Sequence, residues 1–309
     1  MEERYLAMED GHKLFYRVWP VSEPKATLHI NHGMAEHSLR YERFALDMNR
    51  LGFSVYCQDH RGHGLTKEED EKGWFAESDG SSVVCRDSWE VDKRISQDHP
   101  LIPHFIFGHS MGSFITRIVL SEHSEAFDAA VICGTGAYQG IIGKIGRRIA
   151  LMHARKWGSR MPDQDMDKLA FSAYSKPFRD EESRFAWLSR DKEEVRKYEE
   201  DPFCGFVCSA SFYADLIDLS NKANDRNRIA NIRKNLPILF ISGSMDPVGG
   251  YSKGVEKVYS LYRKAGIRDV RIKLYEGGRH EILNETNRDE VTRDIADFYS
   301  EMMRDYDGR

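Results

Sequence analysis

Long apolar runs are absent from the sequence. No stretch of its 309 residues approaches the ~20 consecutive apolar residues of a membrane-spanning helix. The first four residues, Met-Glu-Glu-Arg, lack the basic start and apolar run of a secretory signal peptide. Cysteine is scarce. The chain has five cysteines, and this odd number does not suggest a disulfide framework. We therefore expect a protein without membrane spans in a reducing, cytoplasmic setting.

An excess of basic charge is also missing. The chain has 45 Lys and Arg against 50 Asp and Glu, which gives a net charge of −5. No global positive field therefore favours nucleic acid as a partner. The sequence also lacks internal repeats and low-complexity linkers. A chain of this length can bury a large core within one enzyme domain.

The segment Gly-His-Ser-Met-Gly at 108–112 carries the most information. Residues 103–107 before it are apolar and begin with proline, which predicts a buried strand. Residues 112–122 after it place apolar side chains on one face, which predicts a helix. A serine between glycines at such a strand-to-helix turn is typical of a nucleophile elbow, because the turn is strained and crowded. Ser110 is therefore the candidate nucleophile.

A serine nucleophile needs a base and a carboxylate that orients the base, and both are present downstream. A buried strand predicted at 236–242 is followed by a loop with Asp246. An alternating strand predicted at 270–275 is followed by a loop with His280. This is the chain order of the α/β-hydrolase triad. We predict that Ser110, Asp246 and His280 are the catalytic residues.

Acyl transfer also requires N–H donors aimed at the oxyanion of the tetrahedral intermediate. The residue after the nucleophile supplies one donor, which is Met111 here. The second comes from the loop after an early strand. Residues 26–30 predict this strand, and Met34 lies in the loop that follows. Gly33 lets the backbone approach a substrate closely. We predict that the Met34 and Met111 N–H groups form the oxyanion hole.

Other polar side chains have simpler explanations. Asp225 lies in a polar stretch that no strand precedes, so we expect a solvated loop residue rather than the catalytic acid. His32 and His37 have no partners at zinc-ligand spacing, so no metal site is expected there. Cys204 and Cys208, four residues apart, could share a helix face, where packing is favoured over a disulfide or a metal site.

Three sequence blocks resemble the monoacylglycerol lipase and lysophospholipase branch of the α/β-hydrolases. They are residues 32–41 (HGMAEHSLRY), 59–64 (DHRGHG) and 108–112 (GHSMG), and the similarity continues through 242–249 and 277–281. Bacterial members of this branch carry the names lysophospholipase and serine aminopeptidase. The resemblance implies an α/β-hydrolase fold with a mostly parallel eight-stranded sheet flanked by helices. It also implies a lid after the sixth strand and hydrolysis of carboxylic esters that carry an acyl chain.

The alternation of strands and helices, itself typical of a parallel sheet, stops for about a hundred residues. A structureless loop of that length is implausible, and helical patterns fill the stretch. We predict an inserted helical lid at 138–232 on an α/β-hydrolase core formed by 1–137 and 233–309.

The first part of this lid predicts a basic amphipathic helix, because no acidic residue occurs between Asp128 and Asp163. The pattern consists of apolar Ile141, Ile142, Ile145, Ile149 and Met152, with basic Lys144, Arg147, Arg148, Arg155, Lys156 and Arg160. Such a helix can make transient contact with an anionic membrane surface or collect amphiphilic substrate. Packing of its apolar face on the core, with solvated charges outside, is the favoured alternative.

The lid is also rich in aromatic side chains. Apolar surface of this kind suits an acyl chain, because each buried methylene contributes ~0.8 kcal/mol. We predict substrate contacts for Phe178, Trp187, Phe206 and Phe212, although the same side chains could form the lid's own core.

We therefore expect a serine hydrolase that cleaves carboxylic esters of single-chain lipids, monoacylglycerols or lysophospholipids, through an acyl-Ser110 intermediate. The mechanism requires no metal or organic cofactor. A short-chain carboxylesterase is one alternative. An aminopeptidase-type amide hydrolase is another, and it needs acidic lid residues that bind a free amino terminus. A ligand-binding protein that keeps the hydrolase fold without turnover is a third.

Overall fold

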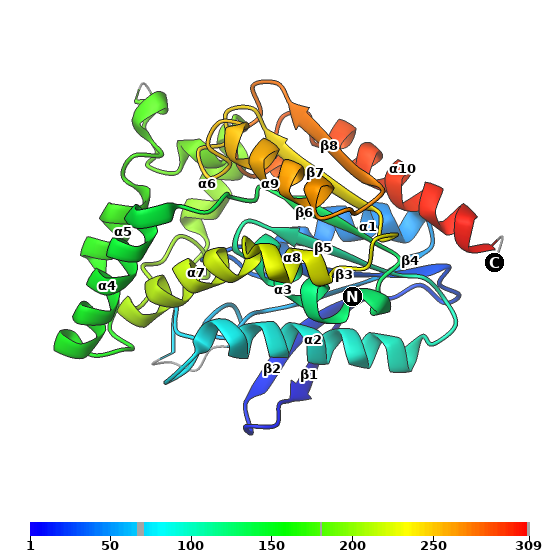
Figure 1. The fold of residues 1–309 in the computed structure, drawn as a ribbon, viewed down its shortest axis with the longest axis horizontal. Helices are drawn as coiled ribbons and strands as arrows, with labels where there is room; N and C mark the ends of the chain where they lie inside the picture. The colour runs from blue at the N-terminus through cyan, green and yellow to red at the C-terminus, as the bar shows by residue number, and fades with distance from the viewer. Residues whose placement is uncertain (67–70, 180, 308–309) are drawn as a thin grey trace.

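The structure, a computed structural model, describes residues 1–66, 71–179 and 181–307. Its centre is an eight-stranded sheet in the order β1-β2-β4-β3-β5-β6-β7-β8 (Figure 1). The strands are β1 (Glu2–Ala7), β2 (Lys13–Trp19), β3 (Ala26–Asn31), β4 (Phe53–Gln58), β5 (His104–His109), β6 (Ala129–Cys133), β7 (Ile238–Gly243) and β8 (Val270–Tyr275). β2 runs antiparallel to β1 and to β4, and the other neighbours are parallel. The expected mostly parallel sheet is confirmed.

Helices cover both faces of the sheet, because its central strands are apolar on both sides. Phe105 and Phe107 of β5 pack on one face with α1 (Glu42–Arg50) and α10 (Arg288–Asp307). Ile106 between them packs on the other face with α2 (Gly80–Asp98), α3 (Met111–His123) and α9 (Lys253–Lys264). Successive side chains of one strand thus enter two different cores.

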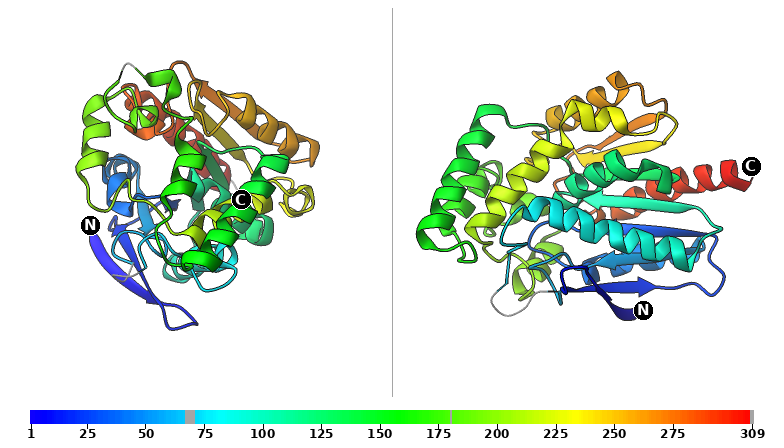
Figure 2. Two further views of the ribbon diagram at one scale, coloured as in Figure 1. Left: turned by 90° about the vertical axis from the view of Figure 1, so that its left-hand side faces the viewer. Right: turned by 60° about the horizontal axis from the view of Figure 1, so that its bottom comes forward.

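The segment between β6 and β7 is helical, as the sequence pattern predicts. It contains α4 (Gly140–Trp157), α5 (Gln164–Phe171), α6 (Lys192–Glu200), α7 (Ala210–Ala223) and α8 (Arg226–Asn231). Short 3₁₀ turns lie at Ser38–Tyr41, Ser124–Ala126, Lys176–Phe178, Ala186–Leu188 and Ile282–Asn284. α4 and α5 stand beyond one end of the sheet, at the left of Figures 1 and 2 (right), and α10 ends on the opposite side. α7 packs on α4 and also on α3 and α2 of the core, so it connects the inserted segment to the sheet.

The loops that follow β3, β5, β7 and β8 converge at one edge of the sheet. Parallel strands end at the same edge, so residues far apart in the chain meet there. Met34 follows β3, Ser110 follows β5, Asp246 follows β7 and His280 follows β8. In the described part of the chain, no helix is long and apolar enough to cross a membrane.

Candidate active site

Ser110 occupies a strained turn between β5 and α3. Its backbone has φ 51° and ψ −118°, a conformation that side chains other than glycine rarely adopt. The flanking glycines are required by close approach. A Cβ atom at Gly108 would collide with Thr116 Oγ1, and one at Gly112 would collide with Asn31 O. The local sequence therefore forms the turn and leaves the serine hydroxyl accessible.

Ser110, His280 and Asp246 form one hydrogen-bond chain. The Ser110 hydroxyl lies 2.9 Å from His280 Nε2, and His280 Nδ1 lies 2.9 Å from Asp246 Oδ1. Asp246 also accepts hydrogen bonds from the Ser242 hydroxyl and the Val248 N–H. Because the ionised carboxylate only accepts, Nδ1 of His280 carries the proton and Nε2 accepts from the serine. The structure thus brings together the three side chains predicted from sequence.

Burial and charge act in opposite directions on the pair His280 and Asp246. Burial alone would lower the pKa of His280, but the Asp246 carboxylate outweighs it and raises that pKa above 6.5. Burial alone would raise the pKa of Asp246, but His280 and the hydrogen bonds lower it. The neighbouring His109 has its ring 4.7 Å from that of His280, and burial together with His280 lowers the pKa of His109 to about 3. His109 is therefore neutral and adds no positive charge beside the base.

Met34 and Met111 are the two residues predicted to form the oxyanion hole. Both residues line the same cavity as Ser110 and His280. Met111 is the first residue of α3, so its N–H belongs to the unpaired amino end of a helix. A Cβ atom at Gly33 would lie 3.2 Å from Ser110 Cβ, which shows how closely the Met34 loop approaches the serine.

A buried ionic network holds this loop, and the sequence argument assigned it no role. Glu36 accepts hydrogen bonds from Gly33 N–H and the Tyr41 hydroxyl. Arg40 donates to Glu36 at 2.8 Å and to both carboxylate oxygens of Glu281 at 2.6 and 2.7 Å. Because Glu281 follows His280, Arg40 connects the Met34 loop to the loop of the base. The sequence signal was the presence of Glu36 and Arg40 within the block 32–41 that carries the family resemblance.

The two carboxyl groups of this network differ in their pKa. Burial dominates at Glu36 and raises its pKa above the ordinary value. Burial acts in the same direction on Glu281, but the bidentate Arg40 guanidinium overcomes it and lowers that pKa to about 2. Glu281 is thus the ionised partner of Arg40.

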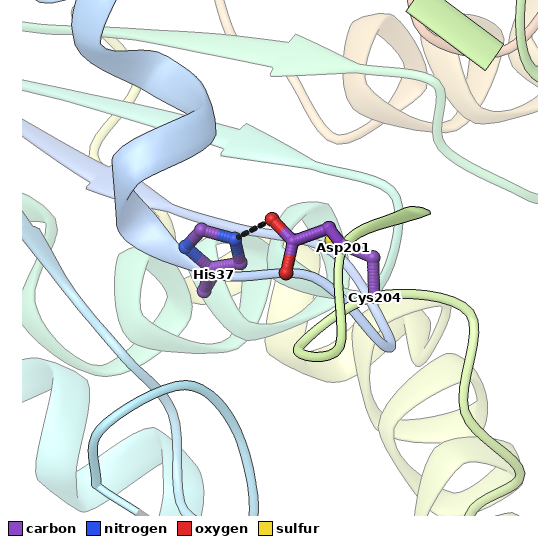
Figure 3. A group of neighbouring side chains, drawn as sticks. All are labelled: His37, Asp201 and Cys204. Atoms are coloured by element: carbon purple, nitrogen blue, oxygen red, sulfur yellow. Dashed lines mark hydrogen bonds and ion pairs between the residues drawn. The ribbon is translucent and has the colours of Figure 1, made fainter. Parts of the chain in front are cut away.

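The inserted segment is hydrogen-bonded to the Met34 loop. Ala35 O accepts hydrogen bonds from the Tyr198 hydroxyl at 2.9 Å and from Gly205 N–H at 3.0 Å. His37 Nε2 lies 2.8 Å from Asp201 Oδ2, beside Cys204 (Figure 3). The loop that carries an expected oxyanion donor is therefore fixed by the segment expected to be the lid.

His37, Asp201 and Cys204 also offer donor atoms within 4.8 Å of one another, a spacing at which a metal ion could bind. Both Asp201 oxygens are already engaged, Oδ2 by His37 and Oδ1 by the N–H of Phe203. Burial raises the pKa of the Cys204 thiol, which favours the protonated form over the thiolate that binds zinc. Hydrogen bonds between the Met34 loop and the inserted segment are a sufficient explanation of why these three side chains lie together.

A cavity of about 790 Å³ opens beside Ser110, between the sheet edge and the inserted helices. Its wall is mostly apolar and includes Phe114, Ile149, Met166, Phe171, Leu216 and Ile217. The wall therefore combines side chains of α3 with those of α4, α5 and α7.

The four aromatic residues predicted to bind substrate lie in different places. Trp187 and Phe206 line the cavity, and the Trp187 ring lies 5.1 Å from that of His280. Phe212 is fully buried and packs on Phe75, 4.8 Å away between ring centroids. Phe178 lies under the Arg279 guanidinium at 4.1 Å. Neither Phe178 nor Phe212 is part of the cavity wall, so the expectation of substrate contact is kept only for Trp187 and Phe206.

The side chains weighed against catalytic, disulfide or metal roles have structural partners. Asp225 caps the amino end of α8, where its exposed carboxylate accepts hydrogen bonds from the N–H groups of Asn227 and Arg228. All five cysteines are free and buried. Cys204 packs in a small cluster with Leu188, and Cys208 belongs to the main core.

Comparison with known proteins agrees with this geometry. The sequence profile of the family described as serine aminopeptidase, S33 matches residues 22–287. The monoglyceride lipase of Mus musculus is 31% identical, over 94% of this chain and 86% of its own. The monoacylglycerol lipase of Mycolicibacterium smegmatis is 28% identical over 95% of each chain. A thermostable carboxyl esterase from Bacillus coagulans, solved in complex with glycerol, superimposes with a TM-score of 0.89 at 26% identity, and 98% of each chain is covered. The chain belongs to the serine aminopeptidase S33 family of α/β-hydrolases, within which it is similar to the monoglyceride lipases.

Proposed function

We propose that this protein is a serine hydrolase that cleaves carboxylic esters of single-chain lipids, monoacylglycerols or lysophospholipids. The observation that best supports the proposal is the Ser110–His280–Asp246 chain at the wall of an apolar cavity. The names of the relatives, monoglyceride lipase and monoacylglycerol lipase, favour monoacylglycerols within this class.

The proposed reaction uses each of these side chains in turn. His280 accepts the hydroxyl proton of Ser110 as Oγ attacks the ester carbonyl carbon, and the Met34 and Met111 N–H groups stabilise the oxyanion. The bond to the alcohol oxygen then breaks, the alcohol leaves with the proton from His280, and acyl-Ser110 remains. Water attacks this ester with the same base, which releases the fatty acid and restores the serine. Asp246 keeps the imidazole oriented throughout.

The cavity supports an acyl chain rather than a small polar group as the ligand. About 790 Å³ of mostly apolar space lies beside Ser110, and Trp187 and Phe206 contribute to its wall. An acyl chain is stabilised there by ~0.8 kcal/mol for each buried methylene. We propose that residues 138–232 act as the lid of this cavity, with α7 as the lid helix that packs on α3 and α2 of the core.

Peptide hydrolysis from a free amino terminus receives less support. A cationic amine needs an unpaired carboxylate near Ser110. The acidic residues in the described cavity wall are Glu36, Asp167 and Glu281. Each has a cationic partner: Arg40 binds both glutamates, and Arg184 lies 4.0 Å from Asp167, which also accepts a hydrogen bond from the Tyr213 hydroxyl. The acidic lid residues that could bind an amino terminus, Glu181, Glu182, Glu193, Glu194, Glu199 and Glu200, lie outside this wall.

The outer face of α4 supports transient docking on an anionic lipid surface. Ile141 and Ile142 are 74% and 78% exposed, so the apolar face of this helix is not packed on the core along its whole length. In the described part of the chain, Lys144, Arg148, Arg155 and Lys156 have no carboxylate within salt-bridge distance. Exposed apolar side chains beside unpaired basic ones are typical of a helix that lies at a membrane surface. Ile142 also lines the cavity, which places the proposed docking surface beside the substrate site.

We further propose a cytoplasmic location. All five cysteines are free thiols, and a reducing compartment keeps thiols from forming disulfides.

The first test is ester hydrolysis as a function of acyl length. Initial rates on nitrophenyl esters from acetyl to palmitoyl should rise toward medium or long chains in the wild type, because the apolar cavity stabilises each added methylene. Ser110→Ala should abolish these rates at every length. Rates confined to acetyl and butyryl esters would instead indicate a short-chain carboxylesterase. If no ester is hydrolysed at a rate that depends on Ser110, the result would favour the amide hydrolase or the non-catalytic ligand-binding protein.

The acid of the triad is tested by Asp246→Asn. The fold should persist, because the amide has the same shape, while kcat should fall by ~10⁴-fold through loss of the productive imidazole tautomer. Asp225→Asn is the matched control and should keep a nearly normal rate, since this exposed residue only caps α8. A nearly normal rate for Asp246→Asn would mean that the acid lies elsewhere.

The pH profile of kcat/KM follows from the raised pKa of His280. The imidazole must be neutral to accept the serine proton, so activity should fall as the pH drops through that pKa. The midpoint should lie above 6.5, because the Asp246 carboxylate stabilises the charged imidazole. Asp246→Asn should move the midpoint of its residual activity to lower pH. A profile that is flat from pH 5 to 8 under chemistry-limited conditions would argue against His280 as the base.

Docking of α4 is tested by cosedimentation with phosphatidylglycerol vesicles. Each basic side chain near an anionic surface contributes ~1 kcal/mol, so the double variant R148Q/R155Q should bind vesicles roughly 30-fold more weakly. Its rate on a water-soluble ester should stay unchanged, because neither arginine lines the cavity. The control R50Q/R94Q removes two exposed arginines outside the lid and should bind normally. Equal vesicle binding by both double variants would contradict the proposal.

A further inference from the structure

Arg117 in the middle of α3 is a buried cation with every donor engaged. Arg117 is only 1% exposed to solvent. Nε donates to the Tyr262 hydroxyl at 3.2 Å. Nη1 donates to Thr135 Oγ1 at 3.0 Å and Gly136 O at 3.3 Å. Nη2 donates to Ala223 O at 2.7 Å and Asn224 Oδ1 at 2.9 Å. These are all five N–H groups of a guanidinium.

None of these partners is a carboxylate, which sets Arg117 apart. The other deeply buried arginines of the described residues, Arg17, Arg61 and Arg279, each pair with Asp or Glu. Burying a cation without a counter-ion is costly. The compensation here comes from carbonyl oxygens and from the carboxyl end of α7, where Ala223 is the last helical residue and the helix dipole is negative. The arrangement therefore favours a particular geometry rather than an ion pair.

Apart from Tyr262 on α9, the partners of Arg117 lie near the two ends of the inserted segment. Thr135 and Gly136 follow β6, where the chain leaves the sheet toward α4. Ala223 and Asn224 end α7, shortly before the chain returns to β7. The two ends also contact each other directly, because Asn224 Nδ2 donates to Gly136 O. One side chain on the helix that begins beside Ser110 thus fastens both ends of the insertion.

Both fastened ends lead directly into the cavity wall. Gly136 and Ala137 line the cavity on one side. Leu216, Ile217 and Ser220 of α7 line it on another, and α4 packs on α7. Arg117 itself is not part of the wall, so it does not touch a ligand there.

We propose that Arg117 is a positioning residue for acyl-chain recognition, which fixes the entry segment and α7 at the separation that the acyl pocket requires. The proposal rests on the proposed function, since it concerns the specificity of the same site. Loss of the guanidinium would leave the serine, its base and the Met34 loop in place, because none of them contacts it. It would free the two walls between which a long chain lies.

The kinetic test compares short and long esters in Arg117→Met. The methionine keeps an unbranched apolar stem but removes all five donors. KM for a decanoyl ester should rise by about tenfold, with little change in kcat. An apolar pocket typically discriminates by about this factor between substrates that differ by one methylene. The acetyl ester should change by no more than roughly twofold, because it does not reach both walls. Arg61→Met is the matched control. It removes another buried arginine, which pairs with Asp87 and lies outside the cavity wall. The ratio of the decanoyl KM to the acetyl KM should stay unchanged in this variant.

Two milder variants keep the test independent of the stability of Arg117→Met. Thr135→Val removes one acceptor at nearly constant volume and should shift the decanoyl-to-acetyl ratio in the same direction by a smaller factor. Arg117→Lys keeps the charge but has only three donors at one point, so it cannot hold both ends and should resemble Arg117→Met.

Hydrogen–deuterium exchange measures the positioning without any substrate. In Arg117→Met, amides at 134–143 and 216–232 should exchange faster, while those of β3 and β5 stay protected. Equal loss of activity on both esters, together with exchange that rises uniformly or not at all, would overturn the proposal. A wild-type enzyme without ester hydrolysis would refute the proposed function alone, since the exchange pattern still reports whether Arg117 holds the two ends.

Discussion

The close approach of α3 to β3 is the constraint on which the site depends. Gly112 allows it, because any side chain there would collide with the backbone of Asn31. The contact brings the strained turn at Ser110 beside the loop that follows β3, so Ser110 and Met34 line the same cavity. The same helix carries Arg117 into the core. One glycine contact thereby fixes the position of the nucleophile, of an expected oxyanion donor and of the side chain that holds the inserted segment.

Burial controls the charges around this edge of the sheet. His109 is kept neutral, and the Arg40 guanidinium keeps Glu281 ionised despite its burial. His280 is the exception, because the Asp246 carboxylate raises its pKa although the ring is buried. The base can therefore acquire a proton during a reaction without a charged His109 ring beside it to oppose it. A site with these properties suits an ester group, because its reacting carbonyl brings no charge of its own.

The inserted segment is attached to the core at places that bear on chemistry. Tyr198 and Gly205 hold Ala35, next to Met34, and Arg117 holds the two ends of the insertion. The proposed lid is thus connected both to the Met34 loop and to α3, the helix after the nucleophile. Motion of the lid would alter the site through these contacts, whereas the hydrogen bonds among Ser110, His280 and Asp246 lie within the core loops.

The sequence by itself determined the elements whose signals are local. The elbow at 108–112, the strands before Asp246 and His280, and the helical insertion after β6 all follow from short patterns of glycine, apolar and polar residues. Tertiary structure decided what depends on long-range contacts. It placed Phe178 and Phe212 outside the cavity wall and left Ile141 exposed, because aromatic or amphipathic pattern does not specify which surface a side chain meets. It also joined residues 117, 135 and 224 through hydrogen bonds, since a buried arginine finds its acceptors only after the strands and helices have packed.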